Sequence, residues 1–185
     1  KALELVNDKS MIKRWSILKS VSDSYLKEKE FEKAIEYYEQ YLACKPNLNF
    51  DDEEGMANIY SKYGDADATK KKEMTTKAVE LFGTLAEKYP VQVVYATFMR
   101  AGLSNKLDDN MKNSLAKADY QKVVDLLANK AERTKGEDTM LKTSYHYLMY
   151  NAFLNKNNAG AKEIAEKILV IDPEYKPALE IQKLK

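Results

Sequence analysis

The chain has few of the residues that mark catalytic, metal-binding or disulfide-bonded proteins. Its 185 residues include one cysteine, Cys44, and one histidine, His146. An intramolecular disulfide and a Cys/His zinc site are therefore excluded. It also lacks a glycine-rich phosphate loop and the His-Glu-x-x-His and Gly-x-Ser-x-Gly motifs. The sequence Asp108-Asp109-Asn110 lacks the further oxygen ligands that calcium needs. These absences predict a protein that is not an enzyme and carries no metal or cofactor.

The chain also lacks an excess of either charge and a long apolar run. Thirty basic side chains stand against twenty-nine acidic ones, for a net charge of +1. Proteins that bind nucleic acid usually carry an excess of positive charge, which this nearly balanced composition lacks. No apolar run approaches the roughly 20 residues of a membrane-spanning helix. We therefore expect no nucleic-acid partner and no direct membrane insertion; the oligomeric state is left open.

Residues that form helices well, such as Ala, Leu, Glu and Lys, dominate the sequence, while glycine and proline are scarce. In Tyr25–Pro46 two amphipathic helical patterns meet at a Lys-Glu-Lys-Glu turn. The second pattern places its apolar residues at helical spacing: Phe31, Ala34, Ile35, Tyr38, Tyr41 and Leu42. This stretch predicts a helix, a turn and a second helix that ends at a proline.

The same second-helix pattern recurs along the chain. Helical patterns end at Pro46, Pro90 and Pro173. Twelve residues before each proline lies a small residue: Ala34, Ala78 and Ala161. Eight residues before each lies another apolar residue: Tyr38, Phe82 and Ala165. A generic helical bundle has no reason to keep these offsets three times.

These offsets resemble the tetratricopeptide (TPR) repeat, a helix hairpin of about 34 residues with Ala-x3-Phe on its second helix and a closing proline. The resemblance implies an all-α fold, a right-handed solenoid of antiparallel helix hairpins, in a single domain over residues 1–185. It has about four TPR-like units and a terminal helix. The predicted units are 15–48, 53–90, 91–135 and 142–175, the terminal helix is 177–185, and residues 1–6 read as the end of a preceding helix.

Two connections within the predicted units are longer than the repeat allows. We expect an expanded connection over 64–73 in the second unit and a longer one over 104–117 in the third. The third unit is the most divergent, with Tyr95 as a core residue of its first helix and Ala131 late on its second. Trp15 is expected to pack against the helix that ends near Val6.

In such a solenoid the first helices line a concave groove. Counting along each predicted first helix gives two groove columns: Lys19, Ala57, Ala96 and His146, and then Asp23, Ser61, Arg100 and Tyr150. Lys27 lies nearby, and we expect Ala57 and Ala96 to tolerate larger side chains. The polar and aromatic members form the predicted partner-binding set: Lys19, Asp23, Lys27, Ser61, Arg100, His146 and Tyr150. Some TPR proteins clamp a C-terminal carboxylate, but the asparagine that this requires in the first unit is missing.

The resemblance and the absence of catalytic motifs predict an interaction scaffold that binds a protein or peptide in this groove. One alternative is a glycan or small-molecule binding module of the cell envelope, suggested by the thirteen tyrosines. Another is a purely structural segment of a larger scaffold. Long insertions of this type are similar to those of bacterial TPR proteins, some of them exported. That similarity favours a bacterial protein of the periplasm or cell envelope over a cytoplasmic one.

Overall fold

A computed structural model describes residues 11–184, with side chains from residue 14 onward, and this range contains helices and no strand. Its α-helices are α1 (Met11–Lys27), α2 (Phe31–Cys44), α3 (Phe50–Ala66), α4 (Lys71–Lys88), α5 (Val93–Lys106), α6 (Lys117–Leu127), α7 (Lys135–Leu154), α8 (Asn158–Ile171) and α9 (Lys176–Gln182). The predicted all-α class is confirmed. The helix end predicted at residues 1–6 lies outside the described residues, and so does the contact expected between it and Trp15.

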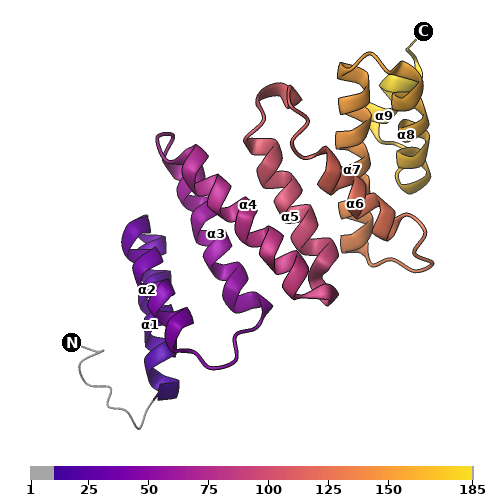
Figure 1. Ribbon diagram of the computed structural model, residues 1–185. Coiled ribbons are helices and arrows are strands. Elements are labelled where there is room, and N and C mark those ends of the chain that lie inside the picture. Colours follow the sequence, from indigo (N-terminus) through magenta and orange to yellow (C-terminus); the bar gives the residue numbers. More distant parts are fainter. Residues whose placement is uncertain (1–10, 185) are drawn as a thin grey trace. The chain divides into compact units, whose positions relative to one another are not determined.

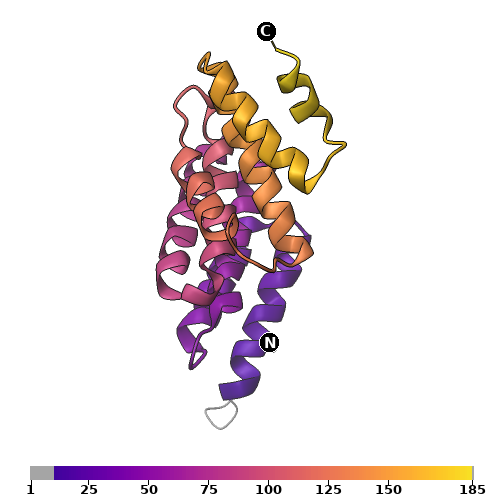
Figure 2. The same cartoon turned by 90° about the vertical axis from the view of Figure 1, so that its right-hand side faces the viewer.

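The chain divides into two compact units, Lys1–Gln92 and Val93–Lys185. Unit 1 holds the hairpins α1/α2 and α3/α4, and unit 2 holds α5/α6, α7/α8 and the short α9. In each hairpin the second helix packs against the first (Figure 1). Figure 2 shows α9 (yellow) beside α8. The single domain expected from the repeat remains a prediction.

Several helices begin with side chains that satisfy free backbone N–H groups. At α3 the Asn49 side chain accepts a hydrogen bond from the Asp52 amide, and the Asp52 carboxylate accepts one from the Asn49 amide. Thr134 and Glu137 form the same reciprocal cap at α7. Such caps typically contribute about 1 kcal/mol each, so they fix where a first helix starts.

The two shortest hairpin turns share one backbone geometry. Lys29, between α1 and α2, has φ 62°, and Lys156, between α7 and α8, has φ 59°. The amide that follows each lysine donates to a carbonyl five residues back, at 2.9 Å for Glu30 to Tyr25 and 3.0 Å for Asn157 to Ala152. These are Schellman-type helix ends, where glycine is the preferred residue at the left-handed position.

The two expected long connections differ in outcome. The expansion expected over 64–73 is wrong, because α3 continues to Ala66 and α4 starts at Lys71, leaving a four-residue turn at 67–70. The additional residues lengthen both helices. Gly64 allows this because a Cβ at that position would lie 2.8 Å from the Thr75 hydroxyl oxygen. The long connection expected over 104–117 is confirmed, with narrower bounds. It covers 107–116, because α5 ends at Lys106 and α6 starts at Lys117.

The core of unit 1 joins the two hairpins through α2. Leu18, Ala34, Tyr38, Tyr41, Met56 and Ile59 form one buried cluster, and Phe31, Tyr63 and Met74 form another. Tyr38 is 2% exposed and Ala34 is fully buried, as the repeat pattern predicts. The hydroxyl of Tyr38 donates to the Asp52 carbonyl at 2.9 Å. The Lys45 ammonium lies 2.6 Å from both Asp52 carboxylate oxygens, so α2 and α3 share a polar contact as well as an apolar one.

The core of unit 2 centres on α7. Buried residues of α6, α7 and α8 meet there, among them Tyr120, Val123, Leu148, Met149, Ala161, Ala165 and Ile168. Two expectations for this region are wrong. Tyr95 is 37% exposed because the buried stripe of α5 runs through Ala96 and Thr97. Ala131 lies beyond α6, which ends at Leu127.

Candidate functional site

The seven predicted site residues fall in both units. Lys19, Asp23, Lys27 and Ser61 belong to unit 1, on α1 and α3. Arg100, His146 and Tyr150 belong to unit 2, on α5 and α7. The expectation that Ala57 and Ala96 line an open groove is wrong, since both side chains are fully buried. Both alanines therefore lie in helix packing and not on the wall of an open groove.

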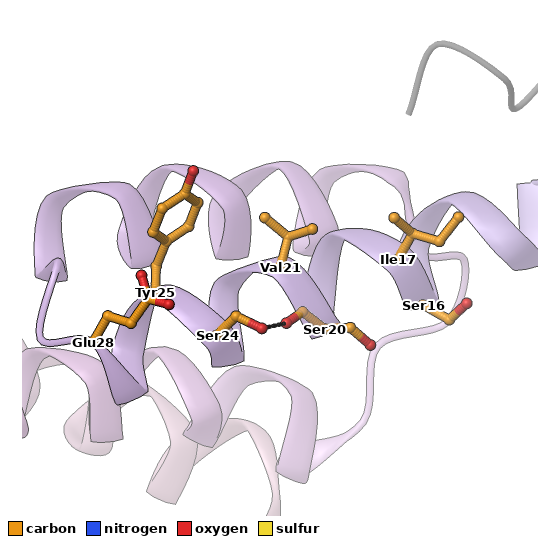
Figure 3. A pocket seen from close by; sticks show the side chains of 7 residues that line it. All are labelled: Ser16, Ile17, Ser20, Val21, Ser24, Tyr25 and Glu28. Carbon is orange, nitrogen blue, oxygen red and sulfur yellow. Dashed lines mark hydrogen bonds between the residues drawn. The ribbon is translucent and has the colours of Figure 1, made fainter. Parts of the chain in front are cut away.

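On α1 the predicted residues form a stripe of their own. The Lys19 ammonium lies 3.4 Å from the Asp23 carboxylate, and both side chains are more than 40% exposed. A hollow of about 500 Å³ runs along another stripe of α1, lined by Ser16, Ile17, Ser20, Val21, Ser24, Tyr25 and Glu28 (Figure 3). The Ser24 hydroxyl in it donates to the Ser20 carbonyl of the same helix at 3.0 Å. Because one helix supplies the whole lining, the hollow does not bring polar groups together from several elements.

Arg100 is engaged by its own hairpin. Its Nε lies 2.8 Å from one carboxylate oxygen of Asp119 on α6, and a terminal nitrogen donates to the other oxygen. This two-pronged contact holds α5 against α6, and the Arg100 side chain is 28% exposed. It therefore acts first as a link within the hairpin.

His146 sits among aromatic rings at the C-terminal half of α7. Its Nδ1 lies 3.3 Å from the Tyr175 hydroxyl, and its ring is nearly parallel to that of Tyr150 with centroids 6.3 Å apart. Burial lowers the pKa of His146 below its ordinary value. At neutral pH the imidazole is therefore uncharged, and its environment is that of a half-buried packing residue.

Tyr150 lines a cleft in unit 2 between α7 and the end of α5 with the connection that follows it, which we call the α5–α7 cleft. Its volume is about 390 Å³, and its walls are Asn105, Asp108, Asn110, Met111, Tyr150 and Leu154. Tyr150 is 42% exposed and Leu154 is 44% exposed. Four residues apart on α7, these side chains present an apolar face opposite the carboxamides of the α5 end and its loop. The arrangement pairs exposed apolar surface with groups that can both donate and accept hydrogen bonds.

The loop that closes this cleft is held in a fixed and strained shape. Asn110, Met111 and Ser114 have φ values of 55°, 56° and 53°, a region that disfavours side chains other than asparagine and glycine. The Asp108 carboxylate, 4% exposed, accepts hydrogen bonds from the Asn113 and Leu115 amides at 2.9 and 3.0 Å. Burial alone would raise the pKa of Asp108, but these amides outweigh it and the pKa is lowered. Asp108 is thus an anionic anchor for the loop.

The loop is also fastened to α7. The buried Asn151 side chain donates from Nδ2 to the Ser114 hydroxyl at 2.7 Å. Consequently the residues on both sides of the cleft are positioned before any ligand arrives, which lowers the entropic cost of binding.

Five cleft residues were not predicted from the sequence: Asn105, Asp108, Asn110, Met111 and Leu154. The signal that could have pointed to them was the polar insertion after the first helix of the third unit. An apolar residue at the last position of α7, where solvent exposure is normal, was a second signal.

Within residues 11–184, no cluster of three or more histidine, cysteine or acidic side chains is placed to hold a metal ion. None of the helices described there combines the length and apolar character needed to cross a bilayer.

Comparison with protein-family models gives no match, and comparison with curated proteins gives none either. Among solved structures, the chain is similar to the C-terminal part of a TPR repeat-containing protein from Cytophaga hutchinsonii. The TM-score is 0.75 at 20% sequence identity, over 94% of this chain and 62% of that one. The chain thus spans less than two thirds of the solved relative. Together with the helix hairpins described above, this likeness establishes that the chain has a TPR-like helical-repeat fold.

Proposed function

We propose that this protein is a non-enzymatic interaction module that binds an extended segment of a protein partner in the α5–α7 cleft. The observation that carries the proposal is the cleft itself, where Tyr150 and Leu154 are exposed on a first helix beside the carboxamides of Asn105 and Asn110. Helical-repeat folds commonly serve as binding scaffolds, which supports the class of function.

The chemistry of the cleft favours a peptide with one apolar side chain between backbone amides. Covering the exposed parts of Tyr150 and Leu154 would contribute about 1 kcal/mol each. Asn105 and Asn110 can each donate to a peptide carbonyl and accept from a peptide N–H. Asp108 does not recognise the ligand in this scheme because its oxygens hold the loop.

The predicted residues outside the cleft are assigned supporting roles. In unit 1, Lys19, Asp23, Lys27 and Ser61 are proposed as further contacts for a longer partner. In unit 2, Arg100 and His146 are proposed to fix the helices that form the cleft, through Asp119 and Tyr175 respectively.

The absence of catalysis in the proposal is supported by the single histidine. The His146 imidazole faces the Tyr175 hydroxyl and the Tyr150 ring, and its pKa is lowered by burial. A general base must reach a proton of the substrate or of a nucleophile. Because the neighbours of the His146 imidazole are packing tyrosines, the proposal gives His146 no role as a general base.

Selection of peptides from a random displayed library on the full chain tests the proposal. The library is first depleted on a Tyr150→Ala/Leu154→Ala double variant, and selected peptides are measured by calorimetry. We expect binding to the wild type that weakens by about thirtyfold in the double variant, since two apolar contacts of about 1 kcal/mol each are lost. The matched control is Val170→Ala/Leu179→Ala, which removes two exposed apolar side chains from α8 and α9 of the same unit. Equal weakening in both double variants, or no peptide that distinguishes the wild type, would contradict the proposal.

A second candidate function is glycan binding, and one observation favours it. An exposed aromatic ring beside carboxamides, as Tyr150 is beside Asn105 and Asn110, also suits a sugar ring. Thermal-shift measurements with a panel of oligosaccharides distinguish the candidates. A sugar that stabilises the wild type but not the Tyr150→Ala/Leu154→Ala variant would replace the peptide in the proposal.

A further inference from the structure

Unit 1 contains a second groove that the proposed function does not use. It lies between the second helices α2 and α4, with α3 as its floor, and has a volume of about 510 Å³. Its lining is Glu39, Leu42, Glu53, Met56, Tyr60, Lys77, Glu80, Leu81 and Thr84. We call it the acidic groove.

Apolar side chains form the bottom of the acidic groove. Met56 and Tyr60 come from α3, Leu42 from α2 and Leu81 from α4. Met56 is 4% exposed, whereas Leu42, Tyr60 and Leu81 are half-buried. The two leucines therefore stand on opposite walls with part of their surface open to a ligand.

Negative charge dominates the walls. Lys77 is already paired with Glu73 at 3.0 Å, and its ammonium lies 5.7 Å from the centre of the Tyr60 ring. Glu53 is paired with Lys88 at 2.7 Å. Within the part of the chain that the structure describes, neither Glu39 nor Glu80 forms a salt bridge. Each wall of the groove thus carries one carboxylate outside any salt bridge of the described residues. Lys77 attracts Glu39 only at longer range, because its ammonium is paired with Glu73.

The negative charge of Glu39 also acts on the Tyr60 side chain at the floor of the groove. The pKa of the Tyr60 hydroxyl is raised, first by burial and then by the negative charge of Glu39.

We propose that the acidic groove binds an amphipathic helical segment of a partner protein, with apolar side chains flanked by lysine or arginine. A helix presents apolar residues three and four positions apart, the spacing that can reach Leu42 on one wall and Leu81 on the other. Basic residues on its flanks would pair with Glu39 and Glu80 on opposite walls. The lining of the acidic groove belongs entirely to unit 1, whereas the α5–α7 cleft belongs to unit 2. The two proposals can therefore be tested independently.

Fluorescence anisotropy with a synthetic probe on the full chain tests this proposal. The probe is a labelled helical peptide of about 18 residues, with leucines along one stripe and lysines on both flanks. The groove variant is Glu39→Lys/Glu80→Lys. The matched control is Glu36→Lys/Glu87→Lys, which makes the same change in net charge on the same two helices at exposed positions outside the groove. We expect about tenfold weaker binding in the groove variant and a change within about twofold in the control.

A second probe, with every lysine replaced by glutamate, should not bind. The proposal is overturned if the two variants weaken binding equally, because the peptide would then sense only net charge. It is also overturned if the acidic probe binds as well as the basic one, or if neither probe binds. Sedimentation of the wild type and the groove variant adds one outcome: a dimer lost only in the groove variant would assign the groove to a second copy of the chain.

Discussion

Two glycines on first helices should respond to alanine in opposite directions. Gly55 lies on α3 and Gly102 on α5, both within helices. In an open helix, glycine to alanine stabilises by about 0.5 to 1 kcal/mol. At Gly102 the nearest atom to a new Cβ is the Tyr120 hydroxyl oxygen at 3.9 Å, an ordinary contact. We therefore expect Gly102→Ala to raise the free energy of unfolding by about that amount.

At Gly55 the same Cβ would lie 1.8 Å from the Tyr38 hydroxyl oxygen and 2.5 Å from the ring carbon that carries it. Reaching an ordinary contact of 3.4 Å requires the hydroxyl to move by about 1.6 Å, since 3.4 − 1.8 = 1.6. Tyr38 is 2% exposed, and that movement breaks its 2.9 Å hydrogen bond to the Asp52 carbonyl. Overpacking costs about 1 to 3 kcal/mol and a broken buried hydrogen bond about 1 to 3. After the helix gain is subtracted, Gly55→Ala should destabilise by about 1 to 5 kcal/mol.

Urea unfolding measures both changes, with circular dichroism as the signal for Gly102→Ala because Gly102 lies in unit 2. Trp15, the only tryptophan in the sequence, packs on Tyr41 with ring centroids 6.0 Å apart, so its fluorescence follows unit 1. With a urea dependence of about 2 kcal/mol per molar, the Gly55→Ala midpoint should fall by about 0.5 to 2.5 M. In a Tyr38→Phe background the loss should shrink, because the closest clashing atom is gone. Stabilisation by Gly55→Ala, or an equal loss in both backgrounds, would refute the packing of α3 against α2.

Three other perturbations follow from the same structure. Lys29→Gly and Lys156→Gly should each stabilise by about 1 kcal/mol in urea unfolding, because each relieves a left-handed lysine; a loss of stability would contradict the turn geometry. Burial would raise the pKa of Asp52, but contacts with lysine, tyrosine and a backbone amide outweigh it and the pKa is lowered. Ionised Asp52 should stabilise the fold fully above the ordinary carboxyl pKa range, and this stabilisation should be lost as pH falls below about 4. The wild type should therefore lose more free energy of unfolding between pH 5 and 3 than an Asp52→Asn variant. Ala57→Leu should destabilise by about 1 to 3 kcal/mol, whereas Ala118→Leu, at an exposed position of α6, should change stability by less than about 0.5 kcal/mol in thermal unfolding.

The repeat pattern predicted the second helices well because their packing is local. Ala34, Ala78 and Ala161 are all fully buried, and Tyr38 and Phe82 fill the positions behind the first two. Each lies at a fixed distance from a proline that ends the helix. Helical periodicity and a clear stop are enough to place such residues.

The first helices were harder to predict because periodicity identifies an apolar stripe without saying which neighbour it faces. Ala57 is compatible with an open face or with close helix packing, and in the structure it is fully buried. Asp52 lies in the first turn of α3 and is buried. Its inward pairing with Lys45 depends on a contact between hairpins that local sequence does not encode.

The candidate site was predicted only at Tyr150. The other cleft residues depend on the path of the 107–116 connection, where Asn110, Met111 and Ser114 adopt left-handed conformations. The buried contacts of Asp108 and Asn151 impose that path, and such contacts outweigh the intrinsic preferences of single residues.

The most direct test of the proposed function is a hydrogen-exchange footprint of the full chain with a peptide selected for its dependence on Tyr150. We predict slower amide exchange over residues 105–116 and at the C-terminal end of α7, with no change along α1 or α4. Protection confined to unit 1, or protection that persists in the Tyr150→Ala/Leu154→Ala variant at saturating peptide, would contradict binding in the α5–α7 cleft.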